Sequence, residues 1–266
     1  MLKKNAIILA IEGSLEMFKK SKAFTLAEIL ITIGILGVVS ALLLPSINTN
    51  VAKTQYVNAL RSISTNLTDK IQAQMALEDV DDVGDLKAFQ NNTEYTGFLR
   101  DLSQIIPMRP ATKDHTNLKA LNGKPKSTVN HYQFAEKLLK ERIYLMKNGG
   151  LIYIGTYIPG GRRANASLEQ IQAYGGQLYR YYADFYIDIN GHREPNIFGR
   201  DIFRFWLGQD GVLYPLGGKD ISIFWGHTDS TWKFSSHNLD WNCHNTTSYG
   251  IGCPGRIREE NWKMNY

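Results

Sequence analysis

The sequence is poor in cysteine and low in mean hydropathy. Only two cysteines occur among 266 residues, which excludes a disulfide-rich scaffold and any zinc site built on four cysteines. A mean hydropathy of −0.27 excludes a protein with many membrane spans. Lys and Arg number 30 against 25 Asp and Glu, a net charge of +5 that indicates only a mild attraction to anionic partners.

Catalytic motifs are also missing. The sequence contains no G-x-S-x-G, H-E-x-x-H, P-loop or C-x-x-C pattern. Its six histidines are scattered, and no spacing of acidic residues marks the carboxylate pair of a glycosidase. We therefore expect a protein that is not an enzyme and that carries no cofactor.

What the sequence does have is one long apolar run near its start. Residues 24–44 read FTLAEILITIGILGVVSALLL, with Glu28 as the single charge. As a helix this run spans about 31 Å, which is one hydrocarbon core. Three lysines lie in residues 19–22, and the next basic residue after the run is Lys53. This asymmetry predicts a single membrane span with its N-terminal end cytoplasmic and the rest outside. A buried core helix is the alternative.

Glu28 lies only four residues into the apolar run. An ordinary secretory signal has a shorter apolar stretch, usually about 7–15 residues, and a small-x-small cleavage site that Leu44-Pro45 does not supply. A carboxylate in lipid costs about 2.5–3.5 kcal/mol on insertion scales, and a plain anchor has no use for it. We therefore predict a functional role for Glu28, with snorkelling toward the cytoplasmic interface as the alternative.

Residues 20–28, which read KSKAFTLAE, resemble the class III signal of type IV pilins and type II secretion pseudopilins. In that family a prepilin peptidase cuts before the apolar stretch, the new first residue is usually Phe and becomes N-methylated, and the fifth is Glu. The resemblance implies a cut between Ala23 and Phe24, with Ala23 in the place of the usual Gly. Glu28 is then the fifth residue, and Pro45 falls where many pilins have a helix-kinking proline.

The resemblance also implies how the protein works. The Glu28 carboxylate of one subunit would pair with the Phe24 amine of its neighbour, so that two buried charges neutralise each other. The chain would be a structural subunit of a type II secretion pseudopilus or a type IV pilus, and the large head favours a minor pilin or pseudopilin. The alternatives are a tip or minor pilin whose head binds DNA, glycan or a surface, and a membrane-anchored enzyme.

Partners and location follow from the same resemblance. The expected partners are the prepilin peptidase, other pilin or pseudopilin subunits, the inner-membrane assembly platform and membrane lipid. The expected location is the bacterial cytoplasmic membrane, crossed once, and then a pilus or pseudopilus. Residues 1–23 form the leader. Residues 17–23 alone would make a basic leader of common length, so residues 1–16 are interpreted as an upstream extension of the reading frame. A long leader is the alternative.

Helical periodicity continues beyond Pro45. Apolar residues recur at helical spacing, at Val57, Leu60, Ile63, Leu67, Ile71 and Met75. We predict one helix of about 50 residues, with a membrane half at 24–45 and an amphipathic half at 46–80. Pro45 lacks an amide proton and should bend the helix near the membrane surface. Residues 81–266 would form a globular head outside the cytoplasm, which gives a pilin-like α+β fold with a small antiparallel sheet.

The head is predicted from local patterns. Strand patterns cover residues 143–158, with a turn at Asn148-Gly149-Gly150, and then 178–189, 201–207 and 212–216. Amphipathic spacing predicts helices at 95–106 and 131–144. Residues 109–130 read as an exposed basic loop, and residues 160–177 as an irregular linker.

Three polar residues are candidates for a calcium site. Asp188, Asn190 and Asp201 could supply oxygen ligands, and some major pseudopilins bind calcium in a C-terminal loop. The EF-hand spacing is absent. The alternative, which we favour, is that these side chains stabilise turns through hydrogen bonds to the backbone.

Cys243 and Cys253 stand ten residues apart near the C-terminus. In an extracytoplasmic domain such a pair predicts a disulfide, and type IV pilins often close a C-terminal loop in this way. Free thiols, or a metal site with His237 and His244, are the alternatives. The head has basic segments at 119–126 and 162–163 and is rich in Tyr and Trp, a combination that can bind single-stranded nucleic acid. We favour the alternative that these segments are ordinary loops exposed to solvent.

Overall fold

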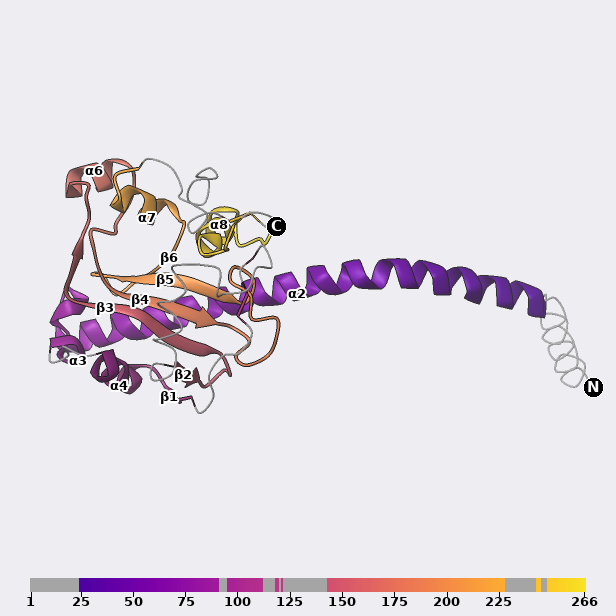
Figure 1. The fold of residues 1–266 in the computed structure, drawn as a ribbon, viewed down its shortest axis with the longest axis horizontal. Helices are drawn as coiled ribbons and strands as arrows, with labels where there is room; N and C mark the ends of the chain where they lie inside the picture. The colour runs from indigo at the N-terminus through magenta and orange to yellow at the C-terminus, as the bar shows by residue number, and fades with distance from the viewer. Residues whose placement is uncertain are drawn as a thin grey trace, which may run out of the picture. The chain divides into compact units, whose positions relative to one another are not determined.

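The computed structural model (Figure 1) describes most of the chain outside its N-terminal 23 residues, namely residues 24–90, 95–111, 118–119, 121, 143–227, 243–244 and 248–266. These residues form a long N-terminal helix followed by a domain with an antiparallel sheet, which confirms the predicted pilin-like α+β class. The contacts divide the chain into two units, residues 1–51 and 52–266.

Helix α2 runs from Leu26 to Glu78. Within the first unit, residues 26–43 have a mean hydropathy of 2.4, and none of this stretch is buried. Ile31, Leu36 and Leu42 are all more than half exposed. A helix that is apolar on every side and long enough to cross a bilayer matches a membrane span in length and composition. The helix continues through residue 45, and the bend expected at Pro45 stays a prediction.

The second part of α2 is amphipathic and belongs to the head unit. The six apolar residues that the spacing singled out are all buried, at Val57, Leu60, Ile63, Leu67, Ile71 and Met75. They form one hydrophobic cluster with residues of the sheet. Burial of a Leu or Ile side chain contributes about 1.5–3 kcal/mol, so this face fixes the helix to the sheet.

Helix α2 ends in a tight turn within the acidic stretch. Asp79 adopts a positive φ of 54°, and the Val80 amide donates to the Met75 carbonyl at 3.1 Å. This is the hydrogen bond of a Schellman motif, which satisfies carbonyls left open by the last helical turn. The chain then continues into a short 3-10 helix at Val83–Asp85 and into α3 at Lys87–Gln90.

Within the described part of the chain, the sheet has six strands whose spatial order is their chain order. They are β1 (Met108–Pro110), β2 (Ile143–Met146), β3 (Leu151–Arg163), β4 (Arg180–Asp188), β5 (Ile202–Gly208) and β6 (Leu213–Pro215). Every neighbouring pair is antiparallel. The hairpin predicted around residues 148–150 and the later strands are therefore confirmed.

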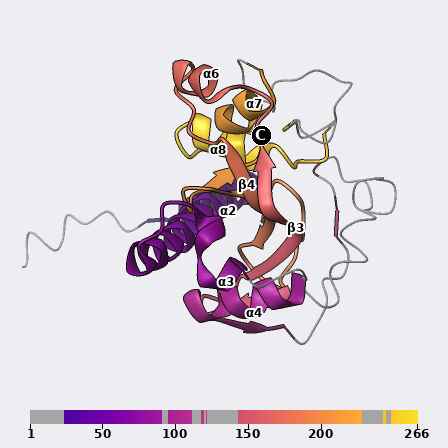
Figure 2. The same ribbon diagram turned by 90° about the vertical axis from the view of Figure 1, so that its left-hand side faces the viewer.

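Both faces of the sheet are buried. Alternate residues of β5 show this directly, because Phe203 and Phe205 join the cluster around α2 while Ile202 and Trp206 join a second cluster. Helices α3 and α4 (Tyr95–Ile105) pack on the α2 side. Helix α7 (Lys219–Phe224) packs on the other side, near α6 (Leu168–Ala173), as Figures 1 and 2 show. The sheet is thus the central layer of the head.

The linker predicted at residues 160–177 was wrong over most of its length. Strand β3 resumes after Gly160 and Gly161, both at positive φ, and Arg162 pairs with Tyr181 beyond a register shift. The two glycines let the strand bulge without ending. In the sequence alone, the same Gly-Gly pair indicates a loop. A capping box between Ser167 and Gln170 starts helix α6.

Two further predictions need correction. Residues 108–110, partly assigned to the loop at 109–130, form the edge strand β1, a three-residue strand too short to show alternation. The helix predicted at 131–144 lies outside the described residues up to 142, but Ile143 and Tyr144 begin strand β2. Their pairing with residues of β3 outweighs the local helical spacing.

Candidate assembly site

Glu28 lies in the first turn of α2, where it forms a capping box with Thr25. The Thr25 amide and the Thr25 hydroxyl each donate to Glu28 Oε2 at 2.9 Å. In return, the Glu28 amide donates to Thr25 Oγ1 at 3.2 Å. Open amide groups at the start of a helix need such acceptors, and a carboxylate near the N-terminus also interacts favourably with the helix dipole.

The capping box adds Thr25 to the residues that sequence reasoning singled out. The T-x-x-E spacing at 25–28, placed directly before an apolar run, is a signal that could have found it. Phe24, at the expected cut, is 79% exposed, whereas Ala23 lies outside the described residues. Glu28 therefore has a partner within its own chain before any neighbour supplies one.

The calcium candidates come together in the structure, in a hydrogen-bonded turn between β4 and β5. Asp188 Oδ1 accepts from the amides of Asn190 and Gly191, at 2.9 and 2.8 Å. Asp201 accepts from the amides of Asn196 and Ile197, at 2.8 and 2.6 Å, and from Asn190 Nδ2 at 3.1 Å. This geometry supports the turn interpretation that we favoured. Among the described residues, no group of three or more His, Cys, Asp or Glu side chains could hold a metal ion.

Asp201 should make the stability of the head depend on pH. Burial raises the pKa of its carboxyl from 3.8 to about 6, and the nearby Asp188 adds to that rise. The folded state therefore binds a proton more tightly than the unfolded chain, so the contribution of Asp201 to stability is largest below about pH 4 and is lost as the pH rises to about 6. We expect a loss of up to about 3 kcal/mol over this window.

Chemical denaturation of the full chain in detergent micelles at a series of pH values would measure this slope. Asp201→Asn removes the titration but also places an amide group among backbone donors, so the variant should be less stable overall and should lack the Asp201 part of the slope. An identical slope in the two proteins would contradict the assignment.

Cys243 and Cys253 are joined by a disulfide, with Cα atoms 4.8 Å apart and both residues buried. Cys253 is the first residue of helix α8 (Cys253–Glu259), and Arg256 Nη1 of the same helix donates to the Cys243 carbonyl at 2.7 Å, which gives Cys243 a second link to α8. In the chain-entropy model a loop this short stabilises by roughly 2–3 kcal/mol. His237, invoked in the metal alternative, lies outside the described residues.

Of the two basic segments, residues 162–163 are described by the structure and residues 119–126 are described only in part. Arg162 lies on β3 with its guanidinium 4.6 Å from the ring centre of Trp225, a cation–π contact. Most of residues 119–126 lies outside the described residues. One basic–aromatic contact between neighbouring elements of the same head is ordinary packing, and nucleic acid stays a weak candidate partner.

Comparison with known proteins locates one match in the chain. The family model described as the prokaryotic N-terminal methylation motif matches residues 18–44. No curated protein and no solved structure matches the chain significantly. The motif implies processing by prepilin peptidase and assembly with other pilin subunits. Residues 18–44 therefore carry the prepilin-type signal of type IV pilins and pseudopilins, as the resemblance of residues 20–28 implied.

Proposed function

We propose that the chain is a structural subunit, a minor pilin or pseudopilin, of a type IV pilus or a type II secretion pseudopilus. The observation that carries the proposal is the methylation motif at 18–44, which coincides with an apolar helix that leaves all its side chains uncovered over residues 26–43. A helix with an apolar surface on every side is unfavourable in water, so another apolar surface must cover it. Lipid covers it before assembly, and the helices of neighbouring subunits cover it afterwards.

The processing step creates the assembly contact. Prepilin peptidase cuts between Ala23 and Phe24 and leaves a new amine on Phe24 in place of a peptide bond. The Glu28 carboxylate of an adjacent subunit pairs with that amine, since each charge would otherwise be stranded in an apolar environment. Pro45 bends the helix where it leaves the membrane, and the disulfide between Cys243 and Cys253 holds the C-terminal end of the head.

The subunit sits in the bacterial inner membrane, with its N-terminus cytoplasmic and residues 81–266 outside, until the inner-membrane assembly platform moves it into a filament. The absence of a catalytic motif and the turn role of the clustered carboxylates both support a structural function over an enzymatic one.

The mature N-terminus and the location of the chain test this proposal together. Mass spectrometry of the chain from sheared surface filaments, or from a pseudopilus fraction, should find a first residue of N-methylated Phe24. A strain without prepilin peptidase should retain a precursor that begins at Met17 and should yield no filament-bound chain. A chain that stays uncut in the membrane of the wild-type strain would contradict the proposal, and a precursor that begins at Met1 would establish the long leader.

A further inference from the structure

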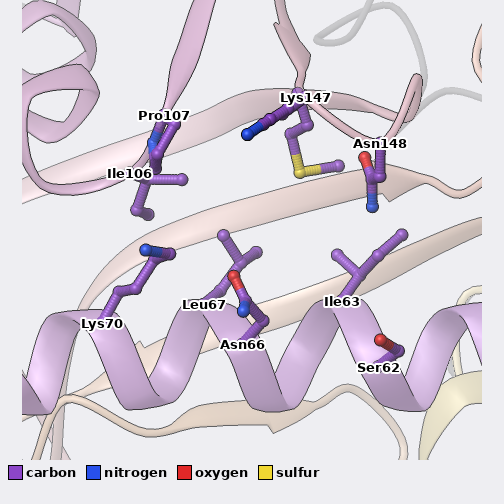
Figure 3. A pocket seen from close by; sticks show the side chains of 10 residues that line it. Ser62, Ile63, Asn66, Leu67, Lys70, Ile106, Pro107, Lys147 and Asn148 are labelled. Atoms are coloured by element: carbon purple, nitrogen blue, oxygen red, sulfur yellow. The ribbon is translucent and has the colours of Figure 1, made fainter.

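The head has a groove between α2 and the segment at the ends of α4 and β2 (Figure 3). Its volume is about 360 Å³. Its apolar lining consists of Ile63 and Leu67 from α2, of Ile106, which faces them from the other side (Figure 3), and of Met146 from β2. Each of these four residues is less than a tenth exposed. A lining of this kind fits an apolar side chain of a partner.

Lysines mark the rim of the groove. Lys70 projects from α2 and Lys147 from the turn after β2, while Ser62, Asn66 and Asn148 supply the other polar lining. Among the described residues that line the groove, none is acidic. Within the described part of the chain, no ion pair involves Lys70 or Lys147. The groove therefore fits a partner that combines an apolar side chain with negative charge.

The chain itself presents a segment with that combination. Leu77, on the last turn of α2, is 81% exposed, and Asp79 and Asp81 directly after it are exposed as well. Neither aspartate forms an ion pair with any residue that the structure describes. The Schellman turn at Asp79 and the partly buried Val80 hold the segment in one conformation, which lowers the entropy lost on binding.

The segment and the groove of a single molecule cannot meet. Leu77 follows Lys70 by seven residues of continuous helix, so a rigid rise of about 10 Å separates their backbones on nearly the same helix face. We propose that the groove receives the segment 77–81 of a second copy of this chain, with Leu77 on the apolar lining and Asp79 and Asp81 beside Lys70 and Lys147.

This contact joins two different surfaces, so each copy keeps one groove and one segment free for further copies. Such a heterologous contact does not close on itself unless the rotation between copies closes a ring, and otherwise it extends into a helical filament. The inference rests on the proposed function and narrows it, because it requires runs of copies of this chain at adjacent filament positions, unlike a minor pilin that is present as isolated copies.

Cysteine cross-linking in cells tests the contact in the full chain. The double variant Lys147→Cys with Asp81→Cys, oxidised in intact filaments, should give a ladder of dimers, trimers and longer products under non-reducing conditions. Either single variant alone should give none, and the two single variants expressed together should give dimers only. The native cysteines are bonded to each other and do not compete. Lys147→Cys with Gln172→Cys, at an exposed position of α6, is the matched control and should give no ladder.

Charge exchange provides a second measurement. For this measurement the cysteine pair is moved to Asn148→Cys and Asp79→Cys. Adding Lys147→Glu should reduce the amount of ladder about tenfold or more, because the new carboxylate faces like charge across the contact. Adding Asp81→Lys to the same chain should restore the ladder. If the chain with Lys147→Cys and Asp81→Cys enters filaments but gives no ladder, the inference is overturned and the proposed function stands. Cross-linking of Lys147→Cys to a different protein, or to itself, would overturn it as well. If the wild-type chain enters no filament, the proposed function fails, and the inference fails with it.

Discussion

Glu28→Ala should remain a substrate for prepilin peptidase and should be lost from filaments. Once Phe24 carries a free amine, the variant leaves that positive charge without a partner in the apolar interior of the filament. Removal of one member of a buried ion pair costs about 3–5 kcal/mol, which is more than a hundredfold in the equilibrium for incorporation. The measurement is the ratio of filament-bound to membrane-bound mature chain, together with the mass of its N-terminal peptide.

The capping box with Thr25 supplies a matched control for this experiment. Glu28→Gln retains an acceptor for the Thr25 amide and hydroxyl, because Gln serves in capping boxes as Glu does, but it removes the charge. Thr25→Val keeps the charge and removes the hydroxyl that caps the helix. If the role is charge pairing, Glu28→Gln fails to assemble and Thr25→Val is affected far less. Assembly of Glu28→Gln at the wild-type level would show that Glu28 only starts the helix.

Gly217→Ala should destabilise the head far more than Gly226→Ala. Both glycines have almost the same backbone conformation, with φ of 85° and 84°, so the strain of a left-handed side chain is matched at about 1–2 kcal/mol. They differ in their surroundings. A Cβ atom at Gly217 would lie 2.3 Å from the Gly252 carbonyl oxygen, whereas one at Gly226 meets no atom of the described residues within 4 Å.

The contact at Gly217 is between backbones and cannot be relieved by a side-chain rotation. The loop after β6 packs directly on the residue before α8, and the Gly255 amide donates to the Leu216 carbonyl at 2.9 Å. We expect Gly217→Ala to cost at least about 1–3 kcal/mol more than Gly226→Ala. Denaturation by guanidinium of the full chain in micelles would measure both free energies of unfolding. Equal losses in the two variants would contradict the close approach of β6 and α8.

The long helix and its buried face could be predicted because their signals are repeated. Six apolar residues at helical spacing all point the same way, and one misplaced residue would not have hidden the pattern. The hairpin at 148–150 was equally predictable, since Gly149 and Gly150 separate two strand patterns. These features are local, and each residue's preference agrees with the final structure.

Other features depend on contacts that no local window contains. The bulge at Gly160 and Gly161 reads as a loop until β4 is seen to pair beyond it. Strand β1 exists only because Arg109 meets Leu145 across a long stretch of chain. The groove with its two lysines is assembled from α2, the turn after α4 and the end of β2, and the spacing of Lys70 and Lys147 in sequence gives no sign of it. Thr25 is the exception, since its role was readable from the sequence.

The strand order of the sheet has a consequence for how the head is built. Each strand pairs with its neighbour in the chain, so a head that emerges outside the membrane behind its helix can add strands one by one, with the partner of each new strand already in place. Apart from the long connection between β1 and β2, such a topology avoids crossovers and limits the time that an unpaired strand edge is exposed to other chains. Helix α8 and the disulfide come last in the chain, so the step that locks the head follows the completion of the sheet.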